Sequence, residues 1–147
     1  MAIRMRNVSG KNETVRTAVA HGEIHASAKT IQKIKKGKIG KGNVLDAATL
    51  AGISGAKKTY DLIPLCHPVR IDHVTMDIRA SGTKVTIESR VTGKDRTGME
   101  MEALTAVMTA ALTIYDMCKP EDPAMKITEI YLIEKTGGKS GDWRRKR

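Results

Sequence analysis

The stretch that decides the fold is GMEMEALTAVMTAALTIYDMCK, residues Gly98 to Lys119. After Gly98 it contains neither Gly nor Pro, and it is followed by Pro120. Proline stops a helix because it lacks a backbone N–H and its ring clashes with the preceding turn. Most of the residues are apolar or small, which is typical of a helix that packs against other elements. The sequence therefore predicts one long, largely buried helix over residues 98–119.

Strand patterns lie on both sides of this helix. Before it, apolar and polar residues alternate from Val74 to Val91 around a Ser81-Gly82 turn, with one slip, which predicts a β-hairpin. After it, residues 127–133 are apolar on both faces near their end, which indicates a strand. Nearer the N-terminus, Val15–Ser27 mixes apolar residues with charges and histidines, a pattern that favours a strand over a helix.

Two helices are expected between the first strand and the hairpin. Ser27 is suited to cap a helix over residues 28–36 that Gly37 ends, and Asn43 is suited to cap the next helix, which starts at Val44. The order strand, helix pair, hairpin, helix, strand predicts an α+β fold of the ferredoxin-like split βαβ type, with an antiparallel sheet and helices packed on one face. Because the hairpin and the last strand are apolar, we expect a partner subunit to cover the other face.

Composition narrows the class of protein. A chain of 147 residues with 40% apolar content suits one domain, residues 1–147, with a short flexible N-terminus and a basic C-terminal tail. Its 26 basic and 16 acidic residues give a charge of +10, which favours an anionic partner. Aromatic residues make up only 3%, so stacking platforms for single-stranded nucleic acid are mostly missing. Without a secretory signal or a membrane span, and with Cys66 and Cys118 expected to be free thiols, the chain is predicted to be cytoplasmic.

Lysines gather in loops and at the ends of elements, a grouping that suits a polyphosphate. For any single lysine, solvated surface charge is the alternative, and at a helix C-terminus so is a favourable contact with the helix dipole. TGGKSG, residues 136–141, is not a P-loop because Ile133 stands where a P-loop requires Gly, which leaves a flexible loop that closes over phosphate as the interpretation. The lysines in question are Lys41, Lys119, Lys135 and Lys139.

Carboxylates at the two ends of the long helix are candidates for proton transfer. Asp116 and Lys119 are i, i+3 neighbours, which makes them either an ordinary helix salt bridge or an acid steered by a cation. Glu102, which follows Glu100, lies roughly 40° around the helix and about 21 Å along it from Asp116. One small reacting group does not touch both, so we hypothesise a site that combines Glu102 of one subunit with Asp116 of another.

The segment LIPLCHP, residues 62–68, is predicted to be an extended, shaped loop because of Pro64 and Pro68. His67 is a candidate for proton transfer or ligand binding, with a capping histidine in a turn as the alternative. A catalytic dyad with Cys66 is not expected, because neighbours in an extended segment point to opposite sides. The methionines of the long helix are interpreted as core filling, and no metal site is predicted.

LIPLCHP, GMEMEALTA with LTIYDMCK, and KTGGKSG together resemble the cyclic pyranopterin monophosphate synthase family of molybdenum cofactor biosynthesis, and the resemblance covers nearly the whole chain. It implies a hexamer of ferredoxin-like subunits, a trimer of dimers with active sites at the dimer interfaces. It also implies a lyase that converts 3′,8-cyclo-7,8-dihydroguanosine 5′-triphosphate to cyclic pyranopterin monophosphate plus diphosphate. No cofactor is implied, and Mg²⁺ accompanying the triphosphate is left open.

The resemblance also implies site residues. Asp116 matches the catalytic residue, and we assign proton transfers to it together with Lys119, with Lys135 and His67 as helpers. Arg16 matches an arginine of the family and suits triphosphate because its planar fork fits phosphate oxygens. The expected catalytic group is Asp116, Lys119, Lys41 and Lys135. The expected substrate-binding group is Leu65, Cys66, His67, Met101, Glu102, Glu100, Arg16 and Lys139.

Two other functions compete with this interpretation. A nucleic-acid-binding module would use the basic residues Lys29–Lys41 and the tail Arg144–Arg147. A scaffold that keeps the fold without activity is the other, and the presence of Lys41, Asp116 and Lys135 argues against it. We therefore expect a small-molecule enzyme that binds neither nucleic acid nor membrane.

Overall fold

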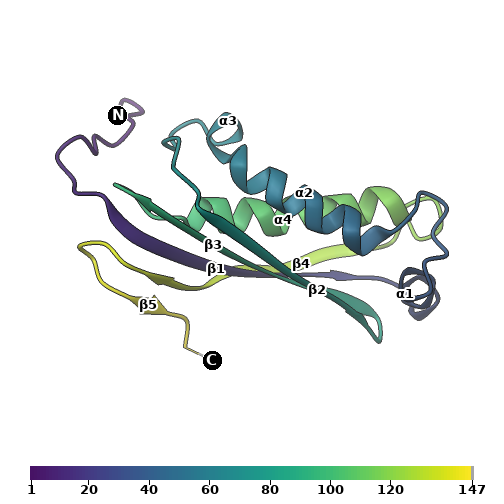
Figure 1. Cartoon of the computed structure of the whole chain (residues 1–147). Helices are drawn as coiled ribbons and strands as arrows, with labels where there is room; N and C mark the ends of the chain where they lie inside the picture. The colour runs from purple at the N-terminus through teal and green to yellow at the C-terminus, as the bar shows by residue number, and fades with distance from the viewer. Residues whose placement is uncertain (147) are drawn as a thin grey trace.

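The computed structural model describes residues 1–146 and consists of an antiparallel sheet with helices packed on it (Figure 1). Residues 1–13 precede the first strand and contain no helix or strand. No helix within residues 1–146 is both long and apolar enough to cross a membrane. The elements in chain order are β1 (Thr14–His25), α1 (Ala28–Lys35), α2 (Val44–Lys57), α3 (Thr59–Leu62), β2 (His73–Ser81), β3 (Lys84–Asp95), α4 (Glu100–Cys118), β4 (Lys126–Thr136) and β5 (Trp143–Arg144).

The sheet has the strand order β2-β3-β1-β4-β5, and every neighbouring pair is antiparallel. Its first four strands have the order of a split βαβ fold, in which the hairpin β2–β3 and the last long strand β4 lie on opposite sides of β1. Helices α2 and α4 lie along one face of this sheet (Figure 1). The predicted α+β, ferredoxin-like class with helices on one face is confirmed.

The long helix is the centre of the core, as predicted. Its buried side lies on β1 and β3, where Ile24, Ile87 and Val91 have no exposed surface, and Ile114 of the helix is fully buried as well. The contact with β1 is close because Gly22 has no side chain: a Cβ there would lie 2.4 Å from Cγ1 of Val107. The slip in the predicted hairpin pattern is Ser89, which is fully buried and donates its hydroxyl to the Ala103 carbonyl at 2.7 Å.

Both predicted helix caps are present. The Ser27 hydroxyl accepts from the Thr30 N–H at 3.2 Å, and the Asn43 side-chain oxygen accepts from the Asp46 N–H at 3.1 Å. Each cap satisfies a backbone donor that the helix itself leaves unpaired. Gly37 follows α1 with φ of +63°, a backbone conformation that favours glycine. The basic loop between α1 and α2 lies beside the end of α4, where Lys41 contacts Asp116.

The expectation that the hairpin is apolar on the uncovered face of the sheet is wrong. Along β2 the half-buried residues are Val74, Met76, Ile78 and Ala80, and the residues between them are exposed. Because successive side chains of a strand point to opposite faces, all the apolar side chains of this strand share the face that α2 covers. The uncovered face instead carries polar side chains and ion pairs, for example between Asp77 and Arg79 at 2.7 Å.

The last strand is covered in a different way. The C-terminal segment, which was predicted to be a basic tail, pairs with β4 as the two-residue strand β5. Arg145 then donates its N–H to the Ile133 carbonyl at 2.8 Å and places its guanidinium over the Tyr131 ring at 4.8 Å. The chain itself therefore covers part of this face, and Arg147 lies outside the described residues.

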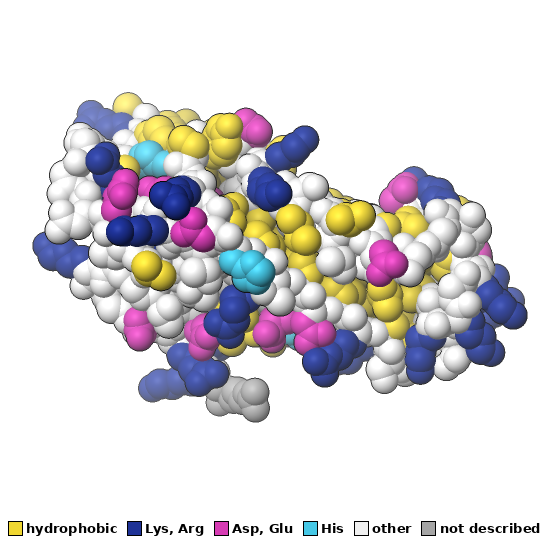
Figure 2. All heavy atoms as spheres, in the orientation of Figure 1, with side chains coloured by type: hydrophobic (Ala, Val, Ile, Leu, Met, Phe, Trp, Pro, Cys, Tyr) yellow, Lys and Arg dark blue, Asp and Glu magenta, His cyan; other side chains and the backbone are white. Residues whose placement is uncertain are grey.

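Large apolar side chains are exposed on the helices rather than on the hairpin. On α4 these are Met101, Met108 and Leu112, and on α2 it is Leu50. The prediction that the methionines fill the core is correct for Met99, which is buried, and wrong for Met101 and Met108. The space-filling view shows apolar side chains gathered along the helix layer (Figure 2).

Candidate active site

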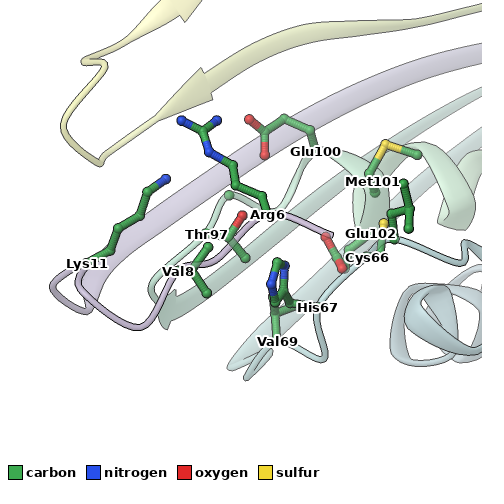
Figure 3. A pocket seen from close by; sticks show the side chains of 12 residues that line it. Arg6, Val8, Lys11, Cys66, His67, Val69, Thr97, Glu100, Met101 and Glu102 are labelled. Carbon is green, nitrogen blue, oxygen red and sulfur yellow. The ribbon is translucent and has the colours of Figure 1, made fainter. Parts of the chain in front are cut away.

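A cavity of about 370 Å³ lies at the N-terminal end of α4 and is built from three segments of the chain. The figure shows side chains from all three directed toward the same space (Figure 3). The first is the irregular N-terminal segment, the second is the loop after α3, and the third is the start of α4. Its principal lining residues are Arg6, Val8 and Lys11 from the first, Leu65, Cys66 and His67 from the second, and Glu100, Met101 and Glu102 from the third.

The loop after α3 is not extended throughout. The Cys66 N–H donates to the Ile63 carbonyl at 3.0 Å, which closes a turn around Pro64 before the chain becomes extended. Cys66 and His67 therefore line the same cavity, and the expectation that they point to opposite sides is wrong. Burial, followed by the charge of Glu102, raises the pKa of the Cys66 thiol. A thiol held protonated is a poor nucleophile, so this cysteine is suited to contact and shape rather than covalent chemistry.

Glu102 is the buried acid of this cavity, with 3% of its surface exposed. Burial raises the pKa of its carboxyl group to about 7, and the charges of Glu100 and Asp95 add to the effect. Burial acts in this direction because an apolar environment disfavours the charged form. A carboxyl group that titrates near neutral pH can give or take a proton under ordinary conditions.

A second, smaller pocket adjoins the first and shares Glu100 with it. Lys135 of β4 pairs with Glu100 at 3.1 Å. Arg16 of β1 donates its Nε–H to the Asp95 carbonyl at 3.1 Å, which holds its guanidinium at the pocket. The glycine loop after β4 completes the wall through residues 137, 140 and 141, whereas Lys139 does not line either pocket.

A third group of predicted residues lies at the C-terminal end of α4. Asp116 accepts from Nζ of Lys41 at 2.9 Å and pairs with Lys119 at 3.0 Å. Lys41 also donates to the Asp116 backbone carbonyl at 3.0 Å, so the loop between α1 and α2 is joined to the helix end. Lys41 first, then Lys119, holds the pKa of the Asp116 carboxyl below its ordinary value. All three side chains are about half exposed, so an incoming ligand can reach them.

The predicted site residues thus form two separate clusters on one subunit, one at each end of α4. Glu102 and Asp116 stand at opposite ends of α4, fourteen residues or about 21 Å apart along its axis. Arg6 and Lys11 line the pocket but were not predicted as site residues from the sequence. The sequence feature that could have indicated them is their positive charge within a segment that has no helix or strand pattern. Across residues 1–146, no three His, Cys, Asp or Glu side chains are grouped so as to hold a metal ion.

The fold and the site define an α+β protein of ferredoxin-like topology, with a pocket rimmed by cations that suits an anionic small molecule.

The profile of the MoaC family matches residues 5–138. Proteins that carry the name cyclic pyranopterin monophosphate synthase are similar over most of their length. The one from Listeria monocytogenes serotype 4a is 51% identical over 142 residues, covering 96% of this chain and 89% of the relative. The one from Thermomicrobium roseum is 51% identical over 144 residues, with 97% and 87% covered. The one from Roseiflexus castenholzii is 50% identical over 141 residues, with 95% and 89% covered. This chain belongs to the MoaC family.

Proposed function

We propose that this chain is a cyclic pyranopterin monophosphate synthase of molybdenum cofactor biosynthesis. It would convert 3′,8-cyclo-7,8-dihydroguanosine 5′-triphosphate to cyclic pyranopterin monophosphate and diphosphate. The family and the relatives support the reaction. The observation that carries the proposal in the structure is a buried carboxyl group, Glu102, in a pocket whose rim bears the cations Arg6 and Lys11.

The chemistry of the reaction explains why the site needs both carboxyl groups and cations. A substrate hydroxyl attacks the α-phosphorus and loses its proton, while the bond to the departing diphosphate breaks and negative charge grows on that group. Fixed cations lower the energy of such a transition state because they stabilise charge as it develops. We assign this stabilisation to Lys41, Lys119 and Lys135. We assign the proton transfers to Asp116 together with Lys119, with Lys135 and His67 as helpers, and substrate binding to Glu102.

A composite site between two subunits follows from the position of the two clusters. Thr109 lies midway along α4 between Glu102 and Asp116, and the exposed side chains of Met108 and Leu112 lie close to that level. Two α4 helices packed antiparallel about a two-fold axis at Thr109 would set Glu102 of one subunit level with Asp116 of the other. The burial of these apolar side chains would favour such a dimer. We propose dimers of this kind, assembled into a hexamer, as the active form.

The deciding experiment is turnover of the enzymatically prepared triphosphate, with diphosphate and the pterin product followed together. We expect the wild-type chain to form both, and Asp116→Asn to lose at least about a hundredfold in kcat, in the range for removing a proton-transfer group. Asp77→Asn is the matched control, because Asp77 is also an exposed aspartate paired with a cation but lies on the uncovered sheet face. Normal turnover by Asp116→Asn would move catalysis to another residue.

Absence of product from the wild-type chain would favour the scaffold or the nucleic-acid-binding module instead. We propose that no resident cofactor takes part, and the same assay with and without EDTA tests whether Mg²⁺ must accompany the triphosphate. A cytoplasmic location stays a prediction from the sequence.

A further inference from the structure

The N-terminal segment 1–13 forms one wall of the pocket at the start of α4, although it contains no helix or strand. It is ordered by a turn in which the Lys11 N–H donates to the Val8 carbonyl at 3.0 Å, and the Ser9 N–H donates to the Asn7 side chain at 2.9 Å. Val8 is the half-buried residue of this turn and lines the pocket together with Val69. This turn therefore presents the side chains on either side of Val8 to the cavity.

Those side chains are Arg6 and Lys11, and both are cations. Within residues 1–146 neither side chain forms a hydrogen bond or an ion pair, while both line the pocket. The close view shows the Arg6 guanidinium and the Lys11 ammonium at the end of the pocket where the Glu100 carboxylate lies (Figure 3). The ion pair of Glu100 is formed with Lys135 of β4 instead.

The charges of the pocket rim therefore favour an anion. Glu100 is compensated by Lys135, and Glu102 is buried where the neutral form of its carboxyl is favoured. The positive charges of Arg6 and Lys11 remain. A guanidinium is suited to two oxygens of one phosphate at once, because its N–H groups form a planar fork.

We infer that Arg6 is a substrate-binding residue that holds the triphosphate end of the substrate at the Glu100 side of the pocket. The inference rests on the proposed function for the identity of the ligand, whereas the unpaired cation and the pocket are independent of it. Arg6 thereby makes the N-terminal segment a part of the site.

The test compares Arg6→Ala and Arg6→Lys with Arg4→Ala, which removes the same charge from the same segment at a residue that does not line the pocket. Steady-state turnover is measured for each, together with calorimetric binding of inorganic triphosphate as a substrate-independent probe. We expect Arg6→Ala to raise KM and the Kd for triphosphate about tenfold, the size of one lost charge-assisted hydrogen bond at a partly exposed site, with kcat within about twofold. Arg6→Lys should recover part of this loss, since it keeps the charge without the fork.

If Arg6→Ala matches Arg4→Ala in KM and in triphosphate binding, the inference is wrong and the proposed function stands. If Arg6→Ala lowers kcat and leaves KM unchanged, Arg6 does not bind the triphosphate and the inference is wrong as well. If the wild-type chain shows no turnover, the proposed function fails, and a selective loss of triphosphate binding in Arg6→Ala still supports an anion site at Arg6.

Discussion

Among single residues, Glu102 shows how burial changes a common side chain into one suited for proton transfer. Its position at the start of α4 and its identity were predicted as part of the site, whereas its pKa of about 7 was not. The reason is that its burial arises only in the folded chain, where the loop after α3 and the N-terminal segment, far from it in the sequence, line the same pocket. Asp116 is the opposite case, since its pair with Lys119 is local and was predictable from the i, i+3 spacing.

The pKa of Glu102 predicts a pH dependence of stability. Since the pKa in the folded state is above the ordinary value of 4.5, the folded state binds the proton more tightly than the unfolded state. The resulting stabilisation is fully present below about pH 4.5 and is lost as the pH rises through about 7. Glu102→Gln keeps the shape without the titration. We expect the free energy of unfolding of the wild type to fall relative to this variant by on the order of 2 kcal/mol between pH 5 and pH 8.

Urea unfolding at the two pH values, at one protein concentration, measures this difference. Glu88→Gln serves as the control, because Glu88 is exposed on β3. Equal pH dependence of the wild type and Glu102→Gln would show that the carboxyl group is not desolvated in the folded protein.

At the scale of elements, the close packing of α4 on β1 depends on a glycine inside a strand. A Cβ at Gly22 would lie 2.4 Å from Val107 Cγ1 and 3.3 Å from Ile130 Cγ1, so Gly22→Ala forces the helix and the sheet apart. We expect a destabilisation of about 1–3 kcal/mol, the usual cost of overpacking a core. Thermal unfolding measures it, with Gly10→Ala as the control because nothing lies within 4 Å of its added Cβ. An unchanged melting temperature of Gly22→Ala would contradict the packing.

The elements differ in how well the sequence predicted them. The helices after Ser27 and Asn43 and the long helix that Pro120 follows have local start and stop signals, and the structure places them within a few residues of the prediction. The strand β5 was missed, because two residues carry no periodicity and their pairing with Glu134 and Lys135 is a tertiary contact.

At the scale of the whole molecule, the separation of the two clusters predicts that subunits complement one another. Glu102→Gln and Asp116→Asn should each be inactive alone. In a coexpressed mixture, half of the dimers are mixed, and each mixed dimer has one site with neither change, so about a quarter of wild-type activity should return. Activity of the purified mixture at matched protein concentration measures this.

A matched control coexpresses Asp116→Asn with Lys41→Ala. These two residues form one ion pair within the same cluster, so no site in a mixed dimer is intact and activity should stay absent. If the mixture of Glu102→Gln and Asp116→Asn is as inactive as each variant alone, the two clusters do not combine into one site across an interface.

The sequence by itself determined the fold class, the long central helix, the capped helices and the family, because each depends on local periodicity, caps or long continuous motifs. Residue types within those motifs also indicated Glu102, Asp116 and His67 as candidates. Only the tertiary structure decided which of them meet. It placed Lys41 on Asp116 and Lys135 on Glu100, and it brought Arg6 into the pocket. The physical reason is that these contacts join residues from distant parts of the chain, and the fold that creates the contact also sets the burial and the charge that give each group its chemistry.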